Sequence, residues 1–308
     1  MSTVAVRRGT VAWPRRASWS QRRDRRGLWF VAPFTVMFVL FLVTPLGYAV
    51  YESLYTTRLV GGRVFVGLDN YREAIHDSTF WSGVWHVALF GAVQIPLMLL
   101  IAFFFATIFD LGVARFGPFF RALFFLPFAV PAVVASVMWN FLLEPSFGPF
   151  AHLAAFLGFP DTNFFSPGLI WPTIVVIVIW EWTGYNMIIL YTALRSVPNE
   201  VVEAAVLDGA TLRKVITRVK LPMVRPAIVM LAFLNVIGAL QLFVEPQILG
   251  EFYPQAISNH FTPTIYIYQR GIAGQEYGIA SATAVLLAIV IVGISTGVLL
   301  LSRRRRRR

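Results

Sequence analysis

Six long apolar runs dominate this 308-residue sequence. Each is long enough for a helix to cross the hydrocarbon core of a bilayer, which is about 30 Å thick. The chain is 57% hydrophobic and only 13% charged, which is too apolar for a soluble domain of this size. We therefore predict an all-α, polytopic membrane protein whose six transmembrane helices occupy residues 28–302. The spans lie near residues 28–50, 83–108, 119–143, 168–194, 223–249 and 277–302.

The basic residues are divided unevenly between the two sides of such a chain. If both termini lie on one side, that side holds 22 of the 26 Lys and Arg residues. The other side keeps only Arg58, Arg63, Arg72 and Arg270. Because cytoplasmic loops carry the excess of Lys and Arg, we expect both termini in the cytoplasm of a cell (inner or plasma) membrane.

Two basic segments flank the spans, at residues 1–27 and 303–308. The first is rich in Arg and cannot build a core, so we expect it to be disordered or to lie on anionic lipid. A cleaved signal or transit peptide is the competing interpretation. The apolar run that follows is longer than the core of a signal peptide and lacks a clear cleavage site, which favours a retained anchor.

A polar and basic island, residues 197–226, separates the fourth and fifth runs. Its residues predict two short helices with a bend. Ser196 or Asn199 can cap a first helix that ends at Asp208, and Gly209 can take the left-handed conformation that terminates it. Thr211 can cap a second helix through about Lys220, which Pro222 is expected to stop. We call residues 196–222 the elbow.

The elbow resembles the EAA loop of the membrane subunits of binding-protein-dependent ABC importers. The resemblance rests on the Glu-Ala-Ala triplet, the glycine four positions later, and the Leu-Pro pair; Val219 stands where the family usually has Ile. It implies a cytoplasmic coupling loop between helices 4 and 5. The ATPase-coupling residues it implies are Glu203, Ala204, Ala205, Asp208, Gly209, Ala210, Leu221 and Pro222.

Segments outside the elbow resemble the carbohydrate-uptake (maltose or glycerol-phosphate type) permeases of the same superfamily. They include residues 65–71, Leu126-Pro127 and residues 276–282. One departure is Gly250 to Pro254, which replaces the glycine-rich turn usual after the fifth span. The resemblance implies a transport subunit, not an enzyme, for sugars or related polyols. The partners it implies are a second permease subunit, an ATPase dimer and an extracytoplasmic solute-binding protein.

Several other functions lack the residues they need. A P-loop requires Gly-Lys-Ser/Thr, but Lys214 and Lys220 follow Arg and Val, so ATP and Mg are expected only in the partner ATPase. The chain has no cysteine and its four histidines are scattered, so we expect no metal site, and no serine, histidine and acid constellation suggests a catalytic site. The basic residues gather at the termini of a membrane protein, which argues against a nucleic-acid partner. An integral membrane enzyme would be expected to cluster acids or histidines at one face.

Polar side chains within the fourth and fifth runs mark a candidate substrate pathway. Glu181 lies near the middle of a span, where a carboxylate costs about 2.5 to 3.5 kcal/mol, so it should face the bundle interior or a wet cavity. Aromatic faces with a few amides and carboxylates are the usual means of holding a polyol. The candidate residues are Glu181, Trp182, Tyr185, Asn186, Asn235, Gly238, Gln241 and Glu245.

Two alternatives remain open for these polar groups. They can join helices by hydrogen bonds without touching a solute. Alternatively, Glu181 can serve as a proton-coupling acid in an ion-gradient-driven secondary transporter or channel. Such folds commonly use inverted repeats, and no convincing internal repeat is found here.

Overall fold

The structure, a computed structural model, describes residues 25–304 except 59–60, 114 and 161. The chain divides into two compact units, residues 1–48 and 49–308. In the first unit, α1 (Arg25–Phe38) continues through the π-helical turn η1 (Val39–Val43) into α2 (Thr44–Glu52), which crosses the boundary between the units. Trp29–Glu52 is apolar and long enough to cross a membrane, as predicted for 28–50. Residues 1–24 and 305–308, which hold most of the two basic segments, lie outside the described residues.

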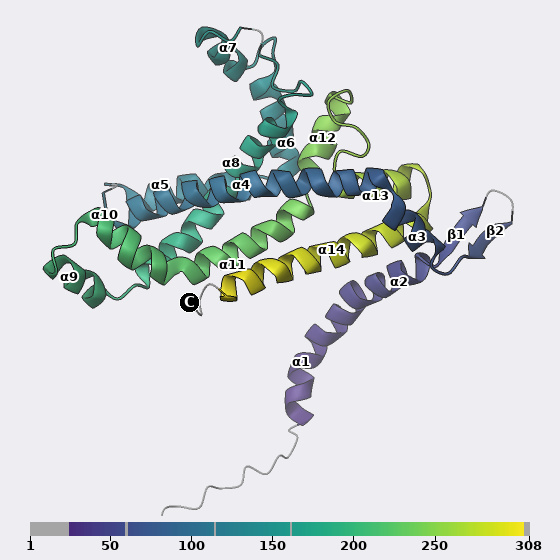
Figure 1. Cartoon of the computed structure of the whole chain (residues 1–308), viewed down its shortest axis with the longest axis horizontal. Helices are drawn as coiled ribbons and strands as arrows, with labels where there is room; N and C mark the ends of the chain where they lie inside the picture. The colour runs from purple at the N-terminus through teal and green to yellow at the C-terminus, as the bar shows by residue number, and fades with distance from the viewer. Residues whose placement is uncertain (1–24, 59–60, 114, 161, 305–308) are drawn as a thin grey trace, which may run out of the picture. The chain divides into compact units, whose positions relative to one another are not determined.

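The second unit is helical apart from one hairpin (Figure 1). Strands β1 (Tyr55–Arg58) and β2 (Gly62–Phe65) pair antiparallel, with Tyr55 opposite Phe65. A short helix, α3 (Asp69–His76), follows the hairpin and precedes the first long span of this unit. The all-α polytopic fold is confirmed, and the hairpin is a small exception within the loop that follows the first span.

Four long helices form the body of the second unit. They are α4 (Ser78–Asp110), α8 (Ile170–Arg195), α11 (Leu221–Leu240) and α14 (Tyr277–Arg304). Helix α4 packs against both α8 and α11, and α11 packs against α14, so the helices lie side by side in Figure 1. Small residues at helical spacing on α4, Ala102 and Ala106, are fully buried and let a neighbouring helix approach closely.

The third predicted span, 119–143, is not one straight helix. Helix α5 (Gly117–Phe125) leads into a 3₁₀ turn, η2 (Leu126–Ala129), and α6 (Ala132–Leu143) leaves at an angle of 99°. The cause is local: Val130, which precedes Pro131, is extended with φ −78° and ψ 127°. A residue before proline is pushed out of the helical region, so the helix breaks there. Helix α7 (Pro149–Phe156) follows α6.

The fifth predicted span, 223–249, also differs from the prediction. Helix α10 (Leu212–Lys214) continues through the π-helical segment η3 (Val215–Lys220) into α11, so the expected stop at Pro222 is wrong. The π turn already departs from the regular hydrogen-bond ladder directly before Pro222, so the amide that proline lacks is not needed there. The helix instead ends at Leu240, and α12 (Val244–Phe252) begins after a short break.

Residues 250–254, which depart from the family pattern, pack against α6 of the broken third span. Tyr253 stacks on Phe165 with ring centroids 4.3 Å apart. Its hydroxyl lies 2.8 Å from Asn140 Oδ1 and 2.9 Å from Glu144 Oε2. Burial and the hydrogen bond to the Glu144 carboxylate raise the pKa of Tyr253. This loop is therefore held by specific contacts to α6 rather than by a glycine-rich turn.

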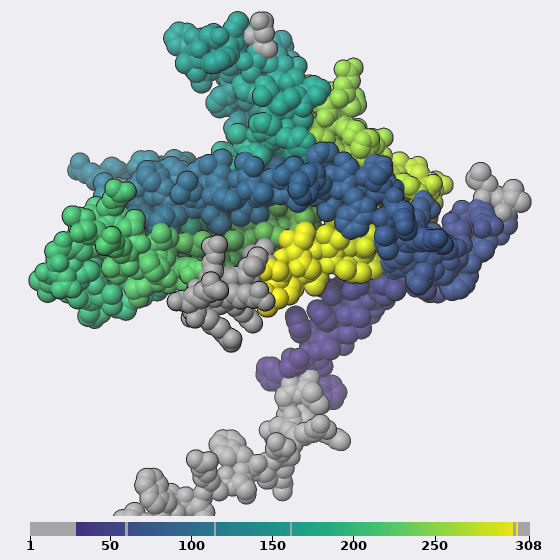
Figure 2. Space-filling view, in the orientation of Figure 1, coloured from purple at the N-terminus to yellow at the C-terminus, as the bar shows by residue number. Residues whose placement is uncertain are grey.

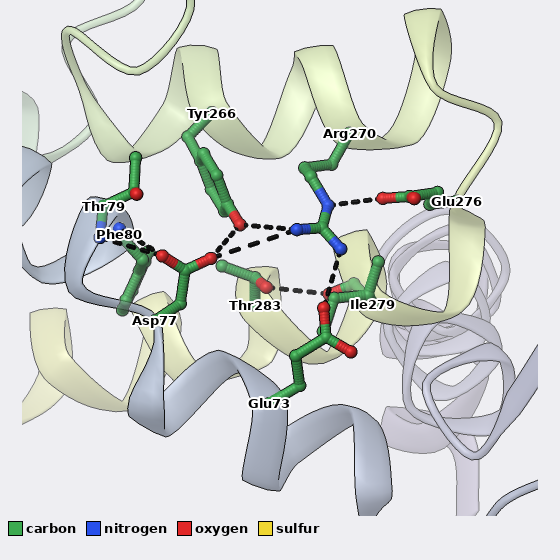
Figure 3. Close-up of polar contacts among 9 residues, drawn as sticks. All are labelled: Glu73, Asp77, Thr79, Phe80, Tyr266, Arg270, Glu276, Ile279 and Thr283. Atoms are coloured by element: carbon green, nitrogen blue, oxygen red, sulfur yellow. Dashed lines mark hydrogen bonds and ion pairs between the residues drawn. The ribbon is translucent and has the colours of Figure 1, made fainter.

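A polar network ties α3 and the start of α4 to the start of α14. Helix α13 (Pro263–Tyr268) and the π turn η4 (Gln269–Ala273) supply its centre. Figure 3 shows Arg270 between Tyr266, which it contacts at 3.0 Å, and Glu73 at 2.8 Å. Arg270 also forms an ion pair with Glu276, and the Tyr266 hydroxyl donates to Asp77.

Asp77 caps α4 within this network. Its Oδ1 accepts hydrogen bonds from the backbone amides of Thr79, at 2.8 Å, and Phe80, at 3.4 Å. Burial acts to raise the pKa of Asp77, but the hydrogen bonds from Tyr266 and these amides outweigh it, so the pKa is lowered. Burial and the hydrogen bond to Asp77 raise the pKa of Tyr266 to about 12. The cap therefore depends on an ionised Asp77.

Candidate functional site

A cavity of about 510 Å³ lies among α4, α8, α11 and the break before α12. This volume is within the range typical of small-molecule sites. The backbone of residues 241–243 is not helical. Irregular backbone is tolerated at membrane depth where it lines a cavity, and these three residues do line it. The lining residues are Phe90, Gln94, Ala132, Val178, Trp182, Tyr185, Leu231, Leu234, Asn235, Gly238, Ala239, Gln241, Leu242, Phe243, Val244 and Glu245.

The structure brings most of the predicted pathway residues to this one cavity. The six that line it are Trp182, Tyr185, Asn235, Gly238, Gln241 and Glu245. The other two, Glu181 and Asn186, are buried behind the wall. Their role in transport stays a prediction, but their convergence from α8, α11 and α12 is a property of the fold.

The two asparagines link α8 to α11. Asn235 Nδ2 donates to Asn186 Oδ1 at 2.9 Å and to the Leu231 carbonyl at 2.8 Å. Asn186 is fully buried and donates to the carbonyl of Trp182 at 2.9 Å. Asn186 thus joins the helices as the interhelical alternative describes, whereas Asn235 also reaches the cavity.

Two carboxyl groups meet at the α12 side of the cavity. Glu181 is 4% exposed and Glu245 is 7% exposed. Neither carboxyl oxygen of Glu181 has a hydrogen-bond partner among the described residues. The Glu245 carboxyl is its neighbour. Burying two neighbouring acids without a basic partner costs free energy, so the pair lowers the stability of the fold.

An aromatic group forms the wall next to the broken span. Phe128, from the 3₁₀ turn η2, stacks on Tyr185 with centroids 4.8 Å apart and planes 25° from parallel. It also meets Trp182 edge to face at 5.2 Å. The bend in the third span therefore supplies the side chain that fixes the two cavity aromatics of α8.

Sequence reasoning missed the contribution of α4. Gln94 lines the cavity and is 2% exposed, with its amide 3.2 Å from Met98 Sδ. It is an uncharged polar residue inside an apolar run, the same signal that marked Asn186 and Asn235. Phe243 carried no such signal, because it reaches the cavity only through the break between α11 and α12.

The elbow begins with helix α9 (Asn199–Leu207), which ends as predicted at a left-handed glycine. Gly209 has φ +78°. The amide of Ala210 donates to the Ala205 carbonyl at 2.9 Å, and that of Gly209 donates to Val206 at 2.9 Å. These two bonds form a Schellman motif, which satisfies the last carbonyls of the helix.

The side-chain caps expected for the elbow are wrong. Pro198 is the N-cap of α9 and Thr211 that of α10, and neither makes a side-chain cap bond. Ser196 instead donates to the Ala193 carbonyl at 2.7 Å, because it terminates α8. The elbow is held by packing: Val197 and Val215 are buried.

The bend of the elbow is exposed at one end of the second unit (Figure 2). Glu203, Ala204, Asp208 and Gly209 are exposed, while Ala205 and Ala210 are half-buried. Leu207, at the bend, is 88% exposed. Leu221 and Pro222 lie in the first turn of α11, beyond the bend.

A nearly buried ion pair fixes the elbow to α4. Lys220 Nζ pairs with Asp110 Oδ2, and the two side chains are 12% and 2% exposed. Asp110 is the last residue of α4, so the pair holds the end of that span against the second arm of the elbow.

Helices long and apolar enough to cross a membrane surround a cavity that carries several polar side chains, and they join an exposed elbow at one end; this arrangement suits a membrane transport protein. Residues 99–307 match the family model described as the binding-protein-dependent transport system inner membrane component, and the chain belongs to this family. The predicted permease identity and a multi-pass membrane location are confirmed. The protein is a transport subunit rather than an enzyme, and its family implies a solute-binding protein and an ATPase as partners.

Relatives and solved structures agree with this assignment. The sn-glycerol-3-phosphate transport system permease protein UgpA of Salmonella choleraesuis (strain SC-B67) is 31% identical over 264 residues, covering 85% of this chain and 88% of that protein. The protein of the same name from Escherichia coli O6:K15:H31 (strain 536 / UPEC) is 30% identical over 264 residues, with the same coverage of 85% and 88%. The fold resembles a chain of a bacterial ABC transporter involved in the import of the acidic polysaccharide alginate, with TM-score 0.73 and 22% identity over 92% of this chain and 96% of that one.

Proposed function

We propose that this chain is one of two non-identical permease subunits in an ATP-driven importer of a sugar or related polyol. The relatives named above for sn-glycerol-3-phosphate, and the solved alginate importer, support a solute with a polyol or sugar framework; both of those solutes are anionic, so they do not settle the charge of the solute carried here. The cavity supports it too, because it combines aromatic faces with the amides of Gln94, Asn235 and Gln241. In this proposal the cavity is this subunit's part of the translocation pathway.

The observation that carries the proposal is the unbroken helical path from the elbow to the cavity. Residues 212–240 are helical throughout, and Asn235 and Gly238 near the far end of the path line the cavity. A helix the length of α11 spans about 30 Å. Because the path has no non-helical break, a displacement of the elbow is transmitted to the cavity wall. The Lys220–Asp110 pair extends the connection to α4.

The elbow is the part that contacts the ATPase in this proposal. Glu203 is exposed and can pair with a basic group, and Leu207 can fill an apolar groove. Ala204 allows the helix backbone to approach the partner closely. The elbow is then cytoplasmic and both termini lie on the same side, as the distribution of Lys and Arg indicates.

Replacement of Gly209 tests the coupling role. A β-branched residue at φ +78° is strained by about 1 to 3 kcal/mol, and no other atom lies within 4 Å of the new Cβ. We expect Gly209→Val, and to a lesser degree Glu203→Ala, to leave the complex assembled in the membrane. The solute-binding protein should no longer stimulate its ATP hydrolysis.

Gly112→Val is the matched control. Gly112 has φ +69° with nothing within 4 Å, and it lies outside the elbow. Normal stimulated hydrolysis and uptake in reconstituted Gly209→Val complex would refute the coupling role. Uptake that follows an imposed ion gradient without ATP would instead favour a secondary transporter.

A further inference from the structure

The cavity lining carries an acid and no base. Among its described lining residues, Glu245 is the only acidic one, and none is Lys, Arg or His. Three basic residues of the second unit are held elsewhere: Lys220 pairs with Asp110, Arg121 lies over the Tyr191 ring at 4.5 Å, and Arg270 is held in its own network. Among the described lining residues there is therefore no cation to neutralise a solute's negative charge.

Glu181 adds a second acid next to the cavity, although it is buried and does not line it. It lies on α8 at helical spacing from Val178 and Tyr185, both of which line the cavity. It is buried, and its carboxyl neighbours that of Glu245. Two neighbouring buried carboxyls do not both ionise, so the pair carries one negative charge. In a region of low dielectric that charge disfavours a second negative charge much more than it would in water. Specificity is often achieved by such repulsion of the wrong ligand.

The other groups of the cavity suit hydroxyl groups. A sugar hydroxyl can donate a hydrogen bond to Glu245, whereas an ionised phosphate or carboxylate group offers only acceptors there. The amides of Asn235 and Gln241 can both donate and accept. Trp182 and Tyr185 present faces on which the apolar side of a sugar ring can lie.

We propose that this cavity accepts an uncharged polyhydroxyl solute and rejects one that bears a phosphate or carboxylate group, with Glu245 as the selecting residue and Glu181 as its support. This inference rests on the proposed function and narrows its class of solute. The selection is electrostatic, so it depends on the charge of Glu245 and not on the volume of its side chain.

Matched pairs of solutes test the proposal. The complete complex, with its binding protein and ATPase, is reconstituted in vesicles and given a mixture of uncharged sugars and polyols. Each is accompanied by its phosphate ester or uronate, and the accumulated solutes are measured by mass spectrometry with and without ATP. We expect ATP-dependent accumulation of an uncharged member. Faster accumulation of its anionic partner would overturn the proposal, whereas accumulation of neither would contradict the proposed function itself.

Variants of Glu245 separate its role from the preference of the binding protein. Because the binding protein is the same in every assay, its preference cancels when the ratio of anionic to uncharged uptake is compared between variants. We expect Glu245→Gln to raise this ratio by about tenfold and Glu245→Asp, which keeps the charge, to leave it low. Glu251→Gln, an exposed acid of α12 outside this cavity, is the control. An unchanged ratio in Glu245→Gln, or equal ratios in the Gln and Asp variants, would refute the selecting role.

Discussion

Gly184 is the position where a single methyl group should do most damage. It lies on α8 between Glu181 and Asn186 and packs directly on the backbone of α5. A Cβ atom placed there would lie 1.8 Å from the Phe124 carbonyl oxygen and 2.9 Å from the Phe125 Cα. To reach an ordinary contact of 3.4 Å, the two backbones would have to separate by about 1.6 Å.

The cost follows from which atoms are in the way. A flexible side chain can rotate aside, but a backbone carbonyl at the end of a helix cannot, so we place Gly184→Ala near the upper end of overpacking costs, about 3 kcal/mol. The displacement would also move η2, whose Phe128 stacks on the cavity residue Tyr185. We therefore expect loss of both thermal stability and transport.

Thermal melting of the purified complex and solute uptake measure the two effects. A destabilisation of this size corresponds to a fall in melting temperature on the order of 5 to 10 °C. The control is Gly293→Ala on α14, where no other atom lies within 4 Å of the new Cβ and alanine is the better helix former. If Gly184→Ala melts and transports like Gly293→Ala, then α8 does not pack on α5 as described and the reasoning fails.

Three further predictions concern topology, the cavity and pH. Tags at Ser2 and after Arg308, both outside the described residues, should be reached only from the cytoplasm; labelling of either from outside intact cells would contradict the six-span topology. Asn235→Leu should lower uptake while leaving assembly with the ATPase intact. It should lower the free energy of unfolding by about 1 to 3 kcal/mol because Asn186 Oδ1 loses its hydrogen-bond donor. Unchanged uptake kinetics would assign both asparagines to helix joining alone. The lowered pKa of Asp77 means that its contribution to stability is complete above its ordinary value of 3.8 and is lost as the pH falls through the lowered folded-state value. Melting temperatures of wild type and Asp77→Asn should therefore differ at neutral pH and converge in acid; a constant difference would show that Asp77 does not titrate in this way.

Local features of the fold could be read from the sequence because their causes are local. A run of apolar residues predicts a membrane helix whatever surrounds it, and Trp29–Glu52 lies where expected. Gly209 takes the left-handed conformation that its position after Asp208 predicted. Polar residues within apolar runs, whose insertion is costly in any fold, identified Asn235, Gln241 and Glu245, and the aromatic residues and the glycine beside such groups identified the other three predicted lining residues.

The effect of each proline, in contrast, was decided by its surroundings. Pro131 breaks the third span by 99°, whereas Pro222 is carried through a continuous helical path. A membrane helix can absorb a proline when neighbouring groups or a π turn satisfy the freed carbonyls. The sequence around each proline does not reveal which neighbours will be present, so the expected stop at Pro222 was wrong and the break at Pro131 was not foreseen.

The sequence by itself thus determined the membrane fold, the elbow and the polar groups available for a site. Only the tertiary structure decided how those groups are used. It buried Asn186 as a link while leaving Asn235 at the cavity, and it brought Glu181 to Glu245. It also paired Lys220 with Asp110, which lies 110 positions earlier in the chain. The physical reason is that such contacts depend on how whole helices pack, and helix packing depends on side chains from several spans at once.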